Sequence, residues 1–246
     1  GTTTITATQV ANSTYCADTA TYTLTVNNTS PFITTSGTLS ALSTTYGTAS
    51  SNTTFSVSTG NLTNDLIIYA PPGFVISLNA GSGFATSLDL GTTTQTNTPI
   101  YVRLAETTSV GTYSGNISLT STGATSVNVA TLPSTVNPKA LTVTGLTGVS
   151  RDYNGLTSAT LSGTPVLSGG ILFSDDVTLS GTGVGTFVDK NFGVGKTVNI
   201  TGFTLTGTKA SNYSLTQPTT MANINVKALS ISAPSIASKV YNGSAV

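Results

Sequence analysis

Residues 197–207 read TVNITGFTLTG, in which apolar side chains alternate with polar ones. The same alternation occurs in TYTLTV (21–26), IYVRLA (100–105) and LTVTGL (141–146). Apolar residues at every second position are typical of a β-strand that buries one face. We therefore interpret each of these segments as a strand whose apolar face lies in a core.

The composition favours strands along the rest of the chain as well. Of 246 residues, 52 are Thr and 31 are Ser, whereas Glu occurs once and Lys six times. Thr, Val and Ile suit a pleated, half-buried surface, while Glu and Lys favour helices. Clusters of Gly, Asn, Ser and Pro interrupt the strand-like segments about every 8–12 residues, which is the spacing of an all-β sandwich. The sequence predicts an all-β fold of antiparallel β-sandwich domains with almost no helix.

One segment of the chain occurs twice. Residues 139–158 read KALTVTGLTGVSRDYNGLTS, and residues 227–246 read KALSISAPSIASKVYNGSAV, beginning 88 residues later. The two copies align without a gap and keep the same alternation in their first residues. A repeat of this period indicates tandem domains along one chain.

The repeat and its flanks divide the chain into four expected segments. We expect complete domains at residues 29–137 and 138–226. Residues 1–28 are expected to be the closing strands of an upstream domain, and residues 227–246 the first strands of a further repeat. Pro138 precedes the second complete domain and predicts a short, stiff junction. Short junctions predict domains that follow one another end to end as an extended rod.

Five side chains are expected to be buried. Phe187, Phe192, Phe203 and Tyr213 should supply the bulk of a core that is otherwise made of Val, Leu and Ile. We interpret Cys16 as a small buried apolar residue, with a disulfide to a group outside the chain as the alternative.

The residues that the chain lacks exclude several classes of function. It has no His, one Cys and 7% charged residues, with a formal net charge of +0. The absence of His excludes Ser-His and Cys-His nucleophiles and His-ligated zinc or haem, and a single Cys excludes an internal disulfide. Scattered Lys and Arg form no electrostatic footprint for nucleic acid. No apolar run approaches the roughly 18 residues of a membrane span, so we expect neither a nucleic-acid partner nor a membrane-spanning segment here.

Four of the seven Asp residues are candidate ligands of a calcium ion. They are Asp152, Asp175, Asp176 and Asp189. Calcium prefers about six to eight oxygen ligands, and turns that carry Asp152 and Asp175–Asp176 could converge at one end of a sandwich. The spacing matches no established calcium loop, so the alternative is that these carboxylates accept backbone N–H bonds in turns. Apart from this calcium site, we predict no cofactor.

No pair of acids has the arrangement of a hydrolase. Such an enzyme needs two carboxyl groups across a cleft, one of them with a raised pKa. Asp175 and Asp176 are adjacent, so on a strand their side chains would face opposite ways. Glu106 is the only Glu. We therefore expect no enzymatic activity.

Residues 139–226 resemble the YDG-type repeat of bacterial adhesins and large secreted proteins. The matching segments are RDYNG (151–155), SDDVTLSGTGVGTFVDKNFGVGKTVNITGFTLTG (174–207) and NYSLT (212–216). The name motif is altered, because Asn154 stands where the family usually carries Asp, and Asn242 does so in the second copy. The resemblance implies a β-sandwich that occurs in tandem arrays.

Residues 31–136 resemble an Ig-like module that is common in Bacteroidetes surface proteins. The matching segments are LSALSTTYGTASSNTTFSVS (39–58), APPGFVIS (70–77), YVRLA (101–105) and GTYSGNISLTSTGA (111–124). Residues 1–28 look like the closing strands of another Ig-like domain. The two resemblances together imply tandem Ig-like and YDG-type sandwiches.

The resemblance also implies a function and a location. Such arrays are typical of exported cell-surface adhesins, including SprB-like gliding-motility adhesins, so we expect an extracellular stalk or filament segment. The alternative is a carbohydrate- or surface-binding module in its own right. The implied partners are neighbouring repeats of the same chain, other copies in a filament, and an external surface or glycan reached through a distal region. Asp18-Thr19-Ala20 resembles the O-glycosylation acceptor of Bacteroidetes exported proteins, which makes Thr19 a candidate modification site, with an unmodified turn as the alternative.

Overall fold

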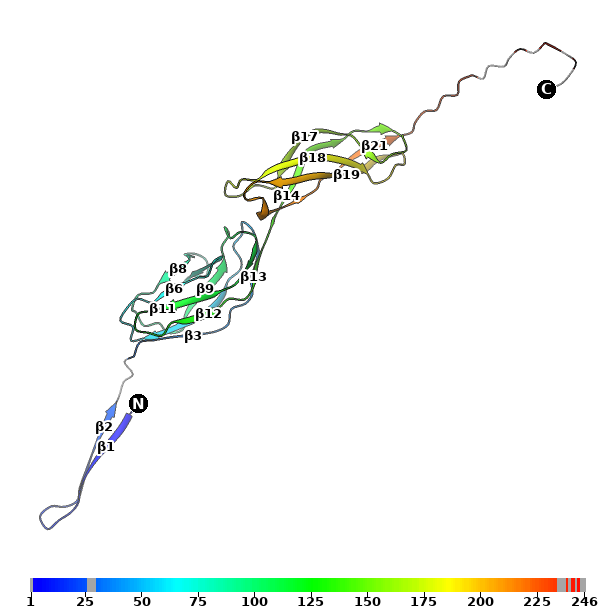
Figure 1. Cartoon of the computed structure of the whole chain (residues 1–246). Helices are drawn as coiled ribbons and strands as arrows, with labels where there is room; N and C mark the ends of the chain where they lie inside the picture. The colour runs from blue at the N-terminus through cyan, green and yellow to red at the C-terminus, as the bar shows by residue number, and fades with distance from the viewer. Residues whose placement is uncertain (1, 26–29, 234–237, 239, 242, 244–246) are drawn as a thin grey trace. The chain divides into compact units, whose positions relative to one another are not determined.

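The computed structural model describes residues 2–25, 30–233, 238, 240, 241 and 243 (Figure 1). Strands make up the regular structure of these residues, apart from one 3₁₀ turn, η1 (Ala210–Asn212). The expected all-β fold is confirmed. No helix in the described part of the chain is long and apolar enough to cross a membrane. The chain divides into two compact units, Gly1–Lys139 and Ala140–Val246.

The first unit begins with an antiparallel hairpin of β1 (Thr2–Gln9) and β2 (Asp18–Thr25). Residues that lie directly opposite share a face, so one face of the hairpin carries eight Thr side chains from four cross-strand pairs. The other face includes Ile5 opposite Tyr22. Every residue of both strands is exposed, so neither face of the hairpin lies against a core of described residues.

The other strands of the first unit form three sheets. Their bounds are β3 (Phe32–Ser36), β4 (Ser43–Thr45), β5 (Thr53–Gly60), β6 (Ile67–Tyr69), β7 (Phe74–Ser77), β8 (Ser87–Asp89), β9 (Thr98–Leu104), β10 (Gly111–Tyr113), β11 (Asn116–Thr120), β12 (Val127–Ala130) and β13 (Ser134–Asn137). The sheet orders are β3-β5-β9-β7, β12-β11-β6-β8 and β10-β13-β4. The expectation of purely antiparallel sheets is wrong for β13 and β4, which are parallel. Parallel pairing is open to them because they are far apart in the sequence and need no tight turn.

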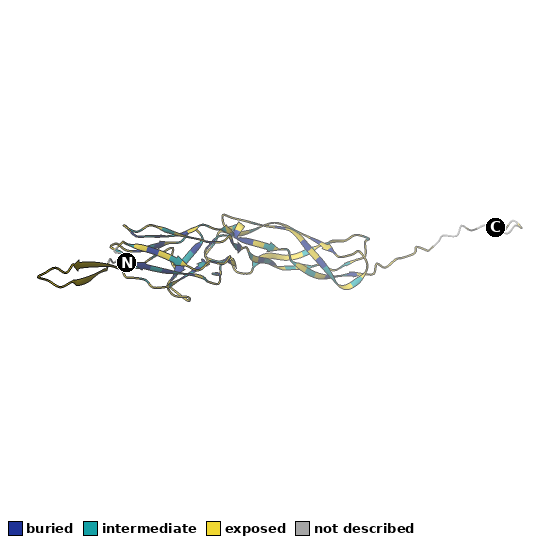
Figure 2. Cartoon of the chain, turned by 90° about the horizontal axis from the view of Figure 1, so that it is seen from below, coloured by how far each residue is buried: buried dark blue, intermediate teal, exposed yellow. Residues whose placement is uncertain are grey.

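Alternate side chains of the central strands form the core of the first unit. Phe55 and Val57 on β5 are buried, as are Ile100, Val102 and Leu104 on β9. Figure 2 shows such buried positions in dark blue, interleaved with partly buried and exposed ones along the strands. This alternation is the one-sided burial that the sequence pattern predicts.

The second unit is built from two sheets. Its strands are β14 (Lys139–Gly148), β15 (Arg151–Asp152), β16 (Ser158–Ala159), β17 (Leu161–Ser168), β18 (Thr178–Phe187), β19 (Gly193–Thr206), β20 (Tyr213–Thr216) and β21 (Thr219–Asn225). The sheet orders are β15-β21-β19-β18-β16 and β17-β14-β20. The short strand β15 is parallel to β21, which is a second exception to antiparallel pairing.

The core of the second unit lies between these sheets. Val143 on β14 packs with Ile200 and Phe203 on β19. A second cluster contains Phe187 and Ile224, from β18 and β21. Because the first cluster joins residues of both sheets, the unit is a two-layer sandwich.

The apolar alternation changes phase within β19. Val198 and Ile200 are followed by Phe203, and all three side chains are buried. Gly202 lies at the change, with a φ of 94°, and the register between β18 and β19 shifts opposite it. The expected strict alternation over 197–207 is therefore wrong at Gly202, where a bulge returns the apolar side chains to the core face.

Residues 227–233 follow β21 and lie in no strand. Their counterparts in the repeat begin β14, which pairs with β17 and β20. A strand needs a hydrogen-bonded neighbour, and no described residue provides one for 227–233. The assignment of residues 227–246 to the first strands of a further repeat stays a prediction. Asn242, which carries the altered motif in the second copy, lies outside the described residues.

Candidate functional site

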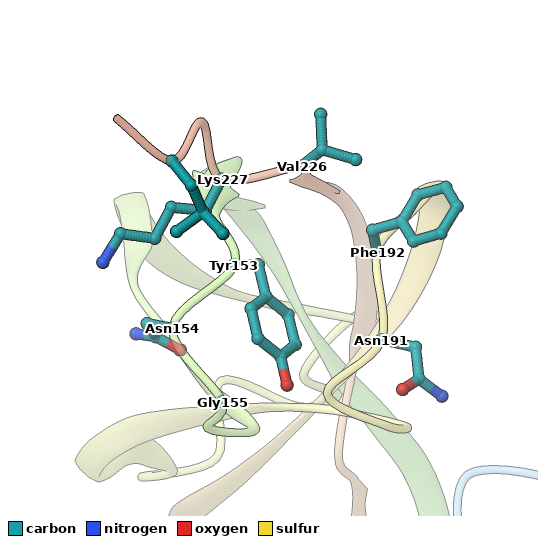
Figure 3. A pocket seen from close by; sticks show the side chains of 8 residues that line it. Tyr153, Asn154, Gly155, Asn191, Phe192, Val226 and Lys227 are labelled. Carbon is teal, nitrogen blue, oxygen red and sulfur yellow. The ribbon is translucent and has the colours of Figure 1, made fainter. Parts of the chain in front are cut away.

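The end of the second unit at which β21 stops carries a recess of about 700 Å³ that is open to solvent. It is lined by Tyr153, Asn154, Gly155, Asn191, Phe192, Val226, Lys227 and Leu229. These residues come from the turn after β15, the loop between β18 and β19, and the segment after β21. Figure 3 shows the Tyr153 ring between the Asn154 turn and the loop of Asn191 and Phe192.

Arg151 holds the turn that carries Tyr153. Its guanidinium donates hydrogen bonds to the side-chain oxygen of Asn154 and to the carbonyl oxygen of Leu156. The same side-chain oxygen of Asn154 accepts the Leu156 N–H at 3.0 Å. The N–H of Tyr153 donates to the carbonyl oxygen of Asn225 at 2.9 Å. These bonds fix the Tyr153 backbone beside the end of β21.

A second set of bonds holds the loop that carries Phe192. Lys196 forms an ion pair with Asp189 and donates to the carbonyl oxygen of Asn191 at 2.8 Å. Asp189 Oδ1 also accepts the N–H of Asn191 at 2.8 Å. The Lys196 hydrogen bond, followed by that of the Asn191 N–H, lowers the pKa of Asp189 below its usual range. Asp189 is therefore ionised at neutral pH and anchors the loop.

The surface of the recess is largely apolar. Phe192 is 68% exposed, Val226 69% and Leu229 89%. The expectation that Phe192 belongs to the core is therefore wrong, because its loop lies outside both sheets. The Asn154 and Asn191 side chains add amide donors and acceptors at the edge. An apolar surface with amides at its edge suits the burial of an apolar group that makes a few hydrogen bonds. The lining residues include no acid–base pair.

The four Asp residues considered as calcium ligands do not come together. Asp152 and Asp189 lie at the recess end of the unit, whereas Asp175 and Asp176 lie at the opposite end of β19. The expected convergence of their turns is wrong, because β19 runs the length of the five-stranded sheet between them. Among the residues that the structure describes, no group of three or more His, Cys, Asp and Glu side chains could hold a metal ion.

Asp175 and Asp176 hold a loop at that opposite end. Asp175 Oδ2 accepts the Tyr213 hydroxyl at 2.7 Å, and the hydroxyl oxygen accepts the Leu172 N–H at 3.0 Å. Burial, and next the hydrogen bond to Asp175, raises the pKa of Tyr213 above its usual value. Asp176 Oδ2 accepts the Thr208 N–H at 2.9 Å. Asp176 thus accepts a backbone N–H, as the alternative to calcium binding predicts, whereas Asp175 accepts the hydroxyl of a tyrosine side chain.

Cys16 and Thr19 lie in the exposed hairpin. Cys16 is a free, exposed thiol between β1 and β2, so the expectation of a buried residue is wrong. Thr19 stands on the Thr-rich face of the hairpin, opposite Thr8, and its N–H donates to Asp18 Oδ1 at 2.8 Å. The residue is exposed and thus accessible to a modifying enzyme, and its glycosylation stays a prediction.

The sequence interpretation did not single out the recess. One signal was present in the residues around Phe192, which stands between Asp189-Lys190-Asn191 and Gly193. A large apolar residue among charged and turn-forming residues is placed in a loop more readily than in a strand. The partners of Phe192 in the recess come from distant parts of the sequence, and no local pattern connects them.

The comparison with known families identifies the second unit. Residues 137–221 match the YDG domain, and the match includes both the turn of Tyr153 and the loop of Phe192. The chain matches no curated protein.

Proposed function

We propose, from the YDG domain at residues 137–221, that this chain is a structural segment of a large exported bacterial cell-surface adhesin. Its role is mechanical: it projects a binding tip or forms the body of an adhesive filament. The observation that carries the proposal is the return of the first segment of this domain at residues 227–246. A domain that recurs along one chain builds length, which a stalk requires.

The path of the chain through the second unit supports this role. β14 begins at the end that holds Asp175, because its residue Ala140 lies beside Gly169 in the loop that leads to Asp175. β21 stops at the recess, at the opposite end of the unit. Tension that enters on β14 and leaves on β21 would act along both strands. It would load the hydrogen bonds that join each strand to its neighbours in its own sheet at the same time, so many bonds share the force.

The proposal also covers the type of the first domain, the location of the protein and the arrangement of its domains. Residues 29–137 are an Ig-like module of the Bacteroidetes type, and the chain works outside the cell in a gliding or adhesive protein. Successive domains follow one another as an extended rod, with neighbouring repeats and other copies as partners. The low charge and the high Thr content support an exposed, exported segment, because both are common in surface stalks.

Small-angle X-ray scattering of the chain tests the extended arrangement. A compact protein of this length has a radius of gyration of about 18 Å. Two sandwiches that follow one another, each with strands roughly 35 Å long, form a rod of about 70 Å, which should give a value of about 22 Å or more. A radius of gyration close to the compact value would contradict the stalk.

A second candidate function is carbohydrate binding at the recess. The observation in its favour is that Tyr153 and Phe192 present aromatic rings there, which can stack on sugar rings. The absence of Trp, the strongest stacking residue, counts against it. A glycan array separates the two functions. Binding that is lost in Phe192→Ala and kept in a control variant, Tyr69→Ala in the first unit, would support the binding module, whereas no binding supports the stalk.

A further inference from the structure

Both ends of the second unit expose large apolar side chains. At one end the recess presents Phe192 and Val226. At the other end, the loop that connects β17 to β18 exposes Ile171 at 41% and Phe173 at 51%. Exposed apolar groups at both ends of a repeating domain suggest that one end can cover the other.

The apolar loop at the far end is held in shape by the sandwich. Its Leu172 N–H donates to the Tyr213 hydroxyl, which in turn donates to Asp175. Phe173 and Ser174 both have positive φ values, 52° and 57°. Two successive residues in this conformation make a tight turn, and Phe173 in this turn is half-exposed.

The same loop lies beside the start of β14. A Cβ added to Gly169 would be 3.1 Å from the carbonyl oxygen of Ala140 and 3.2 Å from the side chain of Leu141. The first residues of a YDG module and its Phe173 loop are therefore close neighbours.

The sequence repeat places the first residues of a further module at the recess. Ala140 and Leu141 correspond to Ala228 and Leu229 in the second copy of the segment, and Leu229 lines the recess. A module that begins at Lys227 would bring its own equivalent of the Phe173 loop next to Leu229. The recess of one module and the loop of the next are thus placed at the same junction.

The chemistry of the two surfaces agrees with this placement. The recess offers an open apolar surface around Tyr153 and Phe192, with amides at its edge. The loop offers the exposed apolar side chains of Ile171 and Phe173. An aromatic side chain that enters an apolar recess is a typical interface anchor.

We propose that the recess of Tyr153, Phe192 and Val226 docks the Ile171–Ser174 loop of a following YDG module, so that successive modules form a fixed joint. This inference rests on the proposed function for the tandem order and names the partner of the recess. It assigns the recess to a second copy of the same domain and leaves no room there for a glycan.

Disulfide trapping in an extended chain tests the joint. The protein consists of residues 1–226 followed directly by a second copy of residues 139–226, with Cys16→Ser in the first unit. Asn191→Cys in the first copy is combined with Ser174→Cys in the second copy, which leaves the Phe192 and Phe173 side chains in place. Both replaced side chains are exposed, so the substitutions should leave each module folded, which circular dichroism verifies. Under mild oxidation, the docked joint should form the disulfide about tenfold faster than a control pair, because it holds the two residues together.

The control pair combines Asn191→Cys with Val184→Cys in the second copy. Val184 is 57% exposed and lies on β18, away from the loop. Equal rates for the two pairs would overturn the joint and leave flexibly linked modules. Scattering of the same proteins distinguishes this outcome from a failure of the stalk, since flexibly linked modules remain extended and a compact chain does not.

Discussion

Gly202 occupies a position in β19 that other residues cannot take without strain. Its φ is 94°, and an added Cβ would lie 2.4 Å from the carbonyl oxygen of Thr182 on β18. Gly145 has the same situation in the facing sheet, with a φ of 84° and a Cβ position 2.3 Å from the carbonyl oxygen of Thr164. Each sheet of the YDG domain thus contains a glycine bulge at which a strand shifts its register and keeps its apolar side chains inward.

Gly202→Ala should lower the free energy of unfolding of the second unit by about 3 kcal/mol, because it adds a steric contact to an unfavourable φ. Gly195→Ala is the matched control, since Gly195 has a φ of 63° with no atom within 4 Å of its Cβ position. The control should cost about 1 kcal/mol, from the backbone conformation alone. Urea unfolding followed by circular dichroism measures both losses. Losses of equal size would show that the contact with Thr182 contributes nothing.

The raised pKa of Tyr213 predicts that the second unit loses stability in alkaline solution. Burial and the hydrogen bond to Asp175 raise its pKa above the ordinary value of 10.0. Between that value and the folded pKa, the unfolded chain releases the Tyr213 proton while the folded chain retains it, so rising pH favours unfolding. The contribution is complete below about pH 10 and is lost as the pH passes through the folded pKa.

Tyr213→Phe removes this titration together with the hydrogen bonds of the hydroxyl. The variant should be less stable than the parent at pH 7, by about 1–2 kcal/mol. The difference between the two proteins should shrink as the pH rises above 10. Urea midpoints at pH 7, 9 and 11 measure the difference, and a gap that stays constant across this range would contradict the raised pKa.

At the scale of the elements, alternation predicts where strands form but not how they pair. Strands lie at all four quoted segments, as β2, β9, β14 and β19. The sheet orders could not be predicted, since β4 pairs with β13 and β15 with β21 across most of a domain. Such pairings depend on which faces meet in the core, and this is not encoded in any local window. The recess that Phe192 and Val226 line escaped prediction for the same reason, because it is formed where the ends of distant strands meet.

The hairpin of β1 and β2 is predicted to be the least stable element of the chain. An isolated two-stranded sheet is marginal in water, and every residue of this hairpin is exposed. Its amide hydrogens should exchange with deuterium within seconds to minutes at neutral pH, whereas those of β19, which lies between two neighbours, should be protected for much longer. Mass spectrometry of peptic fragments measures both, and protection of the hairpin equal to that of β19 would show that its Thr-rich or its apolar face is covered.

At the scale of the molecule, the two units differ in charge as well as in core. Residues 1–139 contain two basic and four acidic side chains, and residues 140–246 contain six basic and four acidic ones. The core clusters of the second unit contain only residues from Val143 to Ile224. A unit whose core is made of its own residues, and which exposes apolar surface at both ends, is suited to be one domain in a tandem array. We expect its folding to need no neighbour, so that its ends remain available for one.

The second unit should therefore fold as a separate protein of residues 137–226. About 90 residues suffice for a two-sheet core, and the core clusters draw on no residue outside this range. Its urea midpoint, followed by circular dichroism, should equal that of the same unit in the whole chain. A shorter protein that begins at Thr144 is the control, because it lacks the buried side chains of Leu141 and Val143 and one of the three strands of the smaller sheet is cut. Loss of two such side chains costs more than about 4 kcal/mol, a large part of the stability of a small domain, so the control should be largely unfolded. An unfolded 137–226, or a midpoint well below that of the whole chain, would show that the first unit contributes to the fold of the second and that the domain is not an independent bead.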